Sequence, residues 1–367
     1  RAIRLDVAAG RLSDLYVDSF ALAYTLGVQL RRFDEARAVL AGLARLGPAG
    51  LVSPQHEARA PYYAGLIAHE AGDLRSALAS YRASREHAAR LGDETHRADV
   101  LSQEALVLLD LGRGAEGAAL YDEAAPIAPS LPVCARATFL NNWSGFLLQL
   151  AGASPEAQAL DPAVPLARAL PLLERDCPDD RLRGFVAMNL AQVSLRAGDP
   201  EAAREAVREA AKTLAISDKH DAAELADVEV QVALASGDRA GAWAAVERLR
   251  EIAEGAVLPA YRRRAALGRA ELLASAGDAA GAQAAYEEAE RLVMNDSLLA
   301  PLGEGRLGFL EQLSRGPTEH VTLLLERPRG AALAASVARR SIAHLLSSLE
   351  TATHLQRQGG EERRAWE

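Results

Sequence analysis

The stretch NLAQVSLRAGDPEAAREAV, residues 189–207, contains the unit from which the chain is built. It begins with residues that favour a helix, reaches Gly198, and continues through Asp199 and Pro200 into a second run of the same kind. A glycine directly after a helix can adopt the left-handed backbone conformation that caps the last carbonyl groups. An aspartate can accept the free amides that open the next helix, and proline suits its first turn. The stretch therefore predicts a helix, a tight turn and a second helix.

The same pattern recurs along the chain with a period of about forty residues. Small residues stand seven positions before and five positions after most of the turn glycines, and a larger residue follows nine positions after most of them. The small residues would let two helices cross closely, and the larger residue would fill the space between repeats. Arg31 takes the glycine place in an earlier copy, so the sequence predicts eight repeats. The seven glycines, spaced by 40, 40, 46, 39, 40 and 39 residues, are Gly72, Gly112, Gly152, Gly198, Gly237, Gly277 and Gly316.

The composition favours an all-α protein. Of the 367 residues, 49% are hydrophobic but only 5% are aromatic, and alanine is the most abundant residue. Alanine favours helices, yet it offers little apolar area to a core. Helices of this kind are stable only when they pack closely against many neighbours. We therefore expect an α-solenoid of short helix pairs.

Charge and hydropathy limit the classes of partner. The formal net charge is −9, and arginines are interleaved with acidic residues, whereas nucleic-acid binding needs concentrated positive charge. No apolar run is long enough for a membrane span, and the amino end is not a signal peptide. We expect a cytoplasmic chain without nucleic-acid or membrane partners. Its start without Met and its helix-favouring end suggest a fragment of a longer protein.

The sequence offers no candidate for a catalytic, metal or cofactor site. Cys134 and Cys177 are too few for a disulfide framework and lack zinc-site spacing, so we expect ordinary thiols. The eight histidines form no i, i+4 pair. Two G-x-G-x-x-G matches, at 112–117 and 303–308, lack the strand and the sheet that a dinucleotide site needs. We expect this chain to be no enzyme and to bind neither a metal nor a cofactor.

The repeat resembles the tetratricopeptide repeat. Gly65, Gly72, Ala77 and Tyr81 match that family's small residue, turn glycine, alanine and aromatic residue, and the stretch at Gly198 is closest to its consensus. The period exceeds the family's usual one and resembles the forty-residue subclass of large bacterial regulators and kinesin light chains. The resemblance implies a right-handed superhelix over residues 1–330. The four prolines between Gly152 and Cys177 cannot all lie inside one helix, so we expect an irregular Pro-rich insertion at about 153–165, with the second helix of that repeat restarting near Asp161 and Pro162. Residues 331–367 would form a long helix or linker toward a domain absent from this chain.

The resemblance also implies a concave groove, lined by the first helix of each repeat, that binds a peptide or protein partner. When the family's groove positions are carried over to this sequence one by one, they give a set of candidate groove residues. Each of these residues could contact a partner or could pack between repeats. The central repeats would expose aromatic and amide side chains, which suit a peptide backbone with apolar anchors. The candidate partner-binding residues are Tyr62, His69, Phe139, Asn142, Phe146, Met188, Gln192, Arg196, Asp227 and Gln231.

Three functions remain open. Residues 324–333 resemble the helix that joins tetratricopeptide repeats to the caspase-like CHAT protease domain in bacterial proteins. The first hypothesis is therefore a scaffold that binds a partner and regulates an effector domain, in cis or in trans, outside this chain. The alternative is the sensor region of a nucleotide-switch transcriptional regulator. The third, an enzyme housed in the solenoid, finds no residue cluster to support it.

Overall fold

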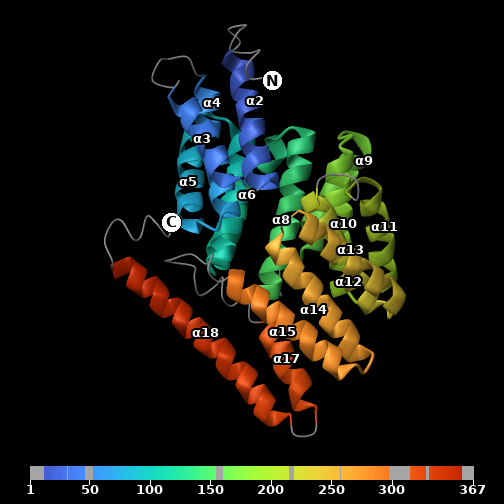
Figure 1. Cartoon of the computed structure of the whole chain (residues 1–367). Helices are drawn as coiled ribbons and strands as arrows, with labels where there is room; N and C mark the ends of the chain where they lie inside the picture. Colours follow the sequence, from blue (N-terminus) through green and yellow to red (C-terminus); the bar gives the residue numbers. More distant parts are fainter. Residues whose placement is uncertain are drawn as a thin grey trace. The chain divides into compact units, whose positions relative to one another are not determined.

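The computed structural model consists of helices (Figure 1). It describes residues 12–30, 32–45, 53–153, 160–214, 219–256, 258–296, 315–327 and 330–357. These residues form sixteen α-helices, one π-helical turn and one 3-10 turn, and they contain no strand. Consecutive helices pack against one another in pairs, as expected for an all-α helical-repeat solenoid. No helix in the described ranges is long and apolar enough to cross a membrane. The compartment and the right-handed superhelix stay predictions.

The chain divides into two compact units, residues 1–179 and residues 180–367, which we call the N-terminal and the C-terminal unit. We call the first helix of each repeat the A helix and the second the B helix. The α-helices of the N-terminal unit are α2 (Leu12–Tyr24), α3 (Phe33–Ala44), α4 (Pro54–Glu70), α5 (Leu74–Leu91), α6 (Glu94–Asp110), α7 (Gly114–Ala124), α8 (Val133–Ala153) and α9 (Ala163–Arg175). The π-helical turn η1 (Thr25–Gln29) follows α2, and the 3-10 turn η3 (Ala128–Ser130) precedes α8.

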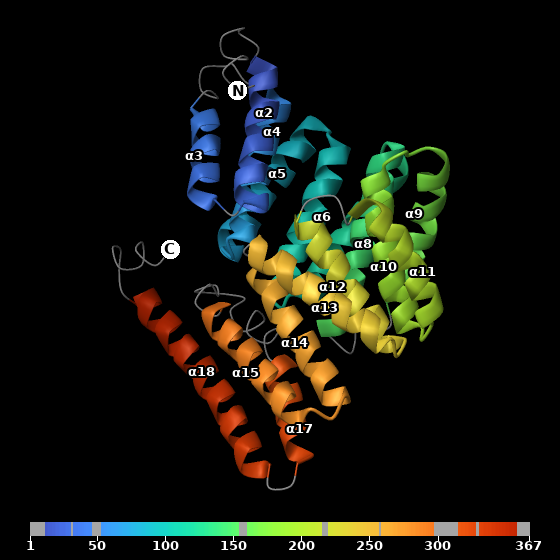
Figure 2. The ribbon, with the colours of Figure 1, turned by 45° about the vertical axis from the view of Figure 1, so that its right-hand side comes forward.

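The C-terminal unit continues the pairing and ends in two helices that form an antiparallel hairpin (Figure 2). The last of them, α18, is the long C-terminal helix that the sequence predicts from residue 331. Its partner α17 also packs against α15. The helices of this unit are α10 (Asp180–Arg196), α11 (Pro200–Leu214), α12 (Lys219–Ala235), α13 (Arg239–Gly255), α14 (Pro259–Ser275), α15 (Ala279–Asp296), α17 (Arg315–Leu325) and α18 (Ala331–Arg357).

Five of the seven predicted turn glycines cap helices as expected. They have φ values between 68° and 80°, in the left-handed region, where a side chain would be strained. The aspartate after the glycine caps the B helix: Asp199 Oδ1 accepts from the amide of Ala202 at 3.0 Å. Gly92 makes a further left-handed turn, which lies between two repeats. The five confirmed glycines are Gly72, Gly112, Gly198, Gly237 and Gly277.

The other two predicted turns are wrong. Gly152 lies inside α8 and Gly316 lies inside α17. The turn of the last pair lies instead between Leu325 and Ala331, where Pro328 in the sequence prevents α17 from continuing. Residues 154–159 of the predicted insertion lie outside the described residues. The restart expected after it is confirmed, because Asp161 Oδ1 accepts from the amide of Ala163 at 2.9 Å, where α9 begins.

The predicted small-residue columns lie where the helices cross. Ala77, Ala105 and Ala203 are 0% exposed, and Tyr81 fills the space between helices with the same exposure. The crossing of α4 and α5 is so close that a Cβ atom built on Gly65 would lie 2.6 Å from the Tyr81 ring. Small residues at these positions are therefore a packing requirement.

The two cysteines form a disulfide, contrary to the expectation of free thiols. Cys134 lies in the first turn of α8, Cys177 follows α9, and their Cα atoms are 5.1 Å apart. Because α8 and α9 pack against each other as a pair, the chain that leaves α9 lies near the start of α8. The separation of 43 positions between the cysteines thus corresponds to one repeat and its return turn, a relation that a search for local cysteine motifs misses.

Candidate binding face of the A helices

Three of the ten predicted partner-binding residues are buried in the core, which corrects their assignment to a groove. Phe139, Phe146 and Met188 are 2%, 0% and 1% exposed. The rings of Phe139 and Phe146 lie 5.7 Å and 5.0 Å from that of Tyr121. In an alanine-rich array, few side chains are bulky enough to fill the contacts between repeats. These three side chains are therefore buried in those contacts and are not available to a partner.

In the N-terminal unit, two of the three predicted residues that are not fully buried, Tyr62 and His69, are engaged with neighbouring helices. Tyr62 on α4 is half-buried, and its ring contacts those of Tyr63, Tyr81 and His96. His69 Nε2 lies 2.7 Å from Asp110 Oδ2, so this pair links the A helices α4 and α6. Asn142 is half-buried on α8. Tyr62 and His69 therefore stabilise contacts between helices, and all three residues offer only part of their surface to a partner.

The other four predicted residues all lie on A helices of the C-terminal unit. Gln192 and Arg196 lie on α10, and Asp227 and Gln231 lie on α12. Arg264 Nη1 of α14 donates to Asp227 Oδ2 at 2.8 Å, and Gln231 Nε2 donates to the same oxygen at 3.3 Å. The name α10–α12–α14 face is used below for the surface formed by Arg181, Phe185, Gln192, Arg196, Asp221, Glu224, Asp227, Gln231, Tyr261 and Arg264.

A second ion pair of this face was missed in the sequence. Arg181 Nε and Nη2 donate to the two carboxylate oxygens of Asp221 at 2.8 and 3.0 Å, and Asp221 is 3% exposed. A two-pronged arginine pair of this kind fixes orientation as well as charge. The partners are separated by 40 residues, one repeat period, as Arg264 and Asp227 are by 37. Opposite charges one period apart on consecutive A helices were the signal that could have found both pairs.

Glu224 lies between these two ion pairs on α12. Burial raises the pKa of its carboxyl, and the carboxylates of Asp221 and Asp227 add to this effect. The opposing influences, which lower the pKa, come from His220 and Arg264. Three carboxylates on α12 thus face two arginines of the neighbouring helices. The guanidinium of Arg264 also lies over the Tyr261 ring, 5.2 Å from its centroid, which further holds it in place.

No family model matches the chain, and no curated protein matches it. The assignment to the tetratricopeptide repeats accordingly stays a resemblance, carried by the residues at the turns and crossings.

Two close serine–histidine pairs occur among the described residues, and neither has the arrangement of a catalytic site. Ser53 Oγ lies 2.8 Å from His56 Nδ1 and also accepts from the His56 amide, so that Ser53 caps the start of α4. Ser84 Oγ lies 2.9 Å from His96 Nε2, but it donates to the carbonyl oxygen of Ala58 at 2.6 Å. Ser84 is 0% and His96 is 4% exposed, so a substrate cannot reach either side chain. Both groups instead join α4, α5 and α6. Among the described residues, no group of three or more His, Cys, Asp or Glu side chains could hold a metal ion.

Asp99, on the A helix α6 of the N-terminal unit, should destabilise the fold when it is ionised. Burial raises the pKa of its carboxyl from 3.8 to about 6, although Arg59 opposes the shift. The folded state therefore holds the proton more tightly than the unfolded state, and stability falls as the pH rises from about 4 to about 6. Because Asp99 keeps partial exposure, we expect Asp99→Asn to raise the unfolding free energy at neutral pH by about 1–2 kcal/mol. Urea denaturation below and above this pH window measures it.

Asp122 supplies the control for this measurement, since it is an exposed carboxylate on α7. Its replacement by asparagine should change the unfolding free energy by less than about 0.5 kcal/mol. If Asp99→Asn gains as little as the control, or gains equally at both pH values, the burial of the Asp99 carboxylate does not limit stability.

Proposed function

We propose that the chain is a protein-interaction scaffold that binds a peptide segment or partner protein along the α10–α12–α14 face. The observation that supports this most is the pair of ion pairs between repeats, Arg181–Asp221 and Asp227–Arg264, which hold side chains on three consecutive A helices in fixed positions. A surface with its side chains already ordered loses little conformational entropy when a partner binds.

The chemistry of this face fits a segment that carries a positive charge. The amides of Gln192 and Gln231 can each donate to and accept from a peptide backbone. Phe185 is half-buried and can contact an apolar side chain. A lysine or arginine of the partner placed beside Glu224 would balance the third carboxylate of α12 and favour its ionised form. We therefore propose a basic residue flanked by apolar ones as the recognised feature.

The regulation of an effector domain outside this chain is a further part of the proposal. It rests on the resemblance of residues 324–333 to the segment before the CHAT protease domain. In the structure this stretch spans the end of α17, the turn and the start of α18, so it is not a single helix. The sensor region of a nucleotide-switch transcriptional regulator remains the alternative.

Selection of peptides from a random displayed library on the full chain tests the proposal. We expect the selected peptides to be enriched in lysine or arginine. The double change Gln192→Ala and Gln231→Ala should weaken their binding about ten-fold or more, because two backbone-directed amides are lost. Affinities are measured by fluorescence anisotropy, and circular dichroism verifies that the helices are retained.

The matched control is Arg208→Ala, which removes a long polar side chain that is 67% exposed on the B helix α11. It should leave the affinity unchanged. Peptides that bind the double variant as tightly as the unchanged chain would place the binding surface elsewhere. Peptides without basic residues would contradict the assigned role of Glu224.

A further inference from the structure

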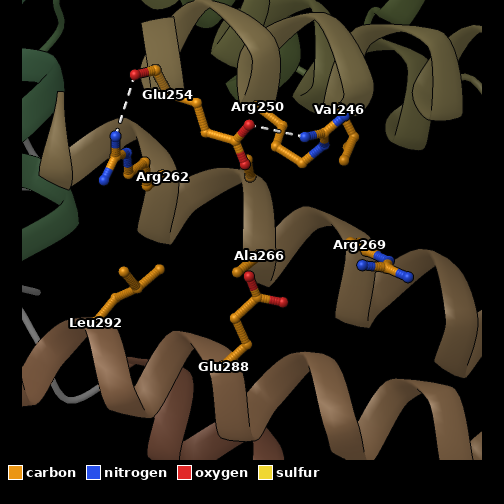
Figure 3. A pocket seen from close by; sticks show the side chains of 9 residues that line it. Val246, Arg250, Glu254, Arg262, Ala266, Arg269, Glu288 and Leu292 are labelled. Atoms are coloured by element: carbon orange, nitrogen blue, oxygen red, sulfur yellow. Dashed lines mark hydrogen bonds and ion pairs between the residues drawn. The ribbon is translucent and has the colours of Figure 1, made fainter. Parts of the chain in front are cut away.

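A pocket of about 350 Å³ lies in the C-terminal unit between the B helices α13 and α15, with α14 behind it (Figure 3). Its floor is apolar and buried, because Val246, Ala265 and Ala266 are between 1% and 6% exposed. Leu292 of α15 completes the apolar part. The size is near the lower end of the range for small-molecule sites, so the pocket suits a compact ligand and not a protein segment.

One apolar position of the pocket floor is smaller than its equivalent in the preceding repeat. Ala265 stands twelve residues before the left-handed Gly277, as Leu225 stands twelve residues before Gly237. Leu225 is 2% exposed and fills its repeat contact in a buried apolar cluster. Alanine at the equivalent place leaves that volume empty.

The charged residues at the mouth also differ from those of the preceding repeat. There, Arg248 of α13 pairs with Glu229 of α12 at 3.0 Å. The equivalent residues one repeat later have the opposite order of charge, Arg269 on α14 and Glu288 on α15. Both are exposed and line the pocket, yet neither makes an ion pair or hydrogen bond within the described part of the chain. The pocket thus presents one cation and one anion that are not paired.

The other charged residues of the lining are already engaged. Arg250 donates to Glu254 at 2.9 Å and to Glu247 at the same distance. Arg262 donates to the carbonyl oxygens of Ala253 and Glu254 at the end of α13, at 3.3 and 3.1 Å. These contacts order one wall of the pocket (Figure 3), and they leave Arg269 and Glu288 as the charges available to a ligand.

We propose that this pocket binds a small zwitterion with an aliphatic part, the chemistry of a free apolar amino acid. Its carboxylate would pair with Arg269, its ammonium group with Glu288, and its side chain would cover Ala265, Ala266 and Leu292. Arg–carboxylate pairing has the geometry for two parallel hydrogen bonds. A ligand with only one charge would leave the other pocket residue without a partner. The pocket shares no residue with the α10–α12–α14 face, so this inference is independent of the proposed function.

Isothermal titration calorimetry on the full chain tests the inference with leucine, isocaproate and isoamylamine. The second probe lacks the ammonium group of leucine, and the third lacks its carboxylate. We expect leucine to bind and each singly charged probe to bind about ten-fold more weakly or worse, because each loses one charge-assisted contact. Arg269→Gln and Glu288→Gln should each weaken leucine binding by a similar factor.

Two further variants control for the location of the site. Arg248→Gln changes the equivalent charge of the preceding repeat and should leave leucine binding unchanged. Ala265→Leu imitates Leu225 and should abolish binding by filling the hollow; if it fails to fold, the two exposed charge variants decide alone. Absence of leucine binding to the unchanged chain overturns the inference. So does isocaproate binding as tightly as leucine, or equal weakening by Arg248→Gln and Arg269→Gln.

Discussion

Reduction of the disulfide between Cys134 and Cys177 is expected to lower the unfolding free energy of the N-terminal unit by about 4 kcal/mol. The bond closes a loop of 43 residues, and the chain entropy that such a loop regains in the unfolded state sets the size of the effect. It also fastens α8 to α9, one of the helix pairs that no left-handed glycine joins within the described residues. Urea denaturation with and without dithiothreitol measures the difference.

The double variant Cys134→Ser with Cys177→Ser controls for the reductant itself. It should have the stability of the reduced chain and show no response to dithiothreitol. Equal midpoints for the oxidised and the reduced chain would contradict the prediction. The redox state of the two cysteines in protein taken from its own cells also bears on the compartment, because a reducing cytosol keeps most cysteines as thiols.

Phe146→Ala should lower the unfolding free energy by about 3–5 kcal/mol, the usual cost of emptying a buried phenylalanine site. Phe146 is 0% exposed and packs against Tyr121. Gly117 of α7 lies directly against the Phe146 ring and has no side chain to fill the cavity. Thermal and urea denaturation followed by circular dichroism measure the loss.

Phe185→Ala is the matched comparison, because this phenylalanine lies half-buried on the A helix α10 beneath the guanidinium of Arg181. Its removal should cost clearly less than that of Phe146 and should weaken binding of the selected peptides. A small stability loss for Phe146→Ala, together with weaker peptide binding, would return Phe146 to the groove that the sequence predicts.

The parts of the fold that depend on local chemistry could be predicted from the sequence. Five turn glycines, the aspartates that follow four of them and the buried alanines at the crossings need only a few neighbouring residues to define them. The two wrong turns share one feature: Gly152 and Gly316 meet the period but lack the start that four of the five confirmed glycines have, an aspartate directly after the glycine. Without that start, a helix can run through a glycine at a cost of about 1 kcal/mol.

The candidate site was less predictable because it depends on contacts one repeat apart. Whether an A-helix side chain faces solvent or the next repeat depends on the crossing of the helices. Phe139 was therefore assigned to a groove although it is 2% exposed, whereas Phe185, at the equivalent place, is only half-buried. The pairs Arg181–Asp221 and Cys134–Cys177 join residues 40 and 43 positions apart, which no local motif describes.

The contrast between Leu225 and Ala265 has a consequence for how such arrays acquire new specificities. A change in one module alters the wall that it shares with its immediate neighbours and leaves more distant modules as they were. Exchanging the two residue types would move the hollow one module along the chain, away from its present charges. Duplication of a repeat followed by the shortening of one side chain is thus a short evolutionary route to a new pocket. The same two changes can be made by protein engineering.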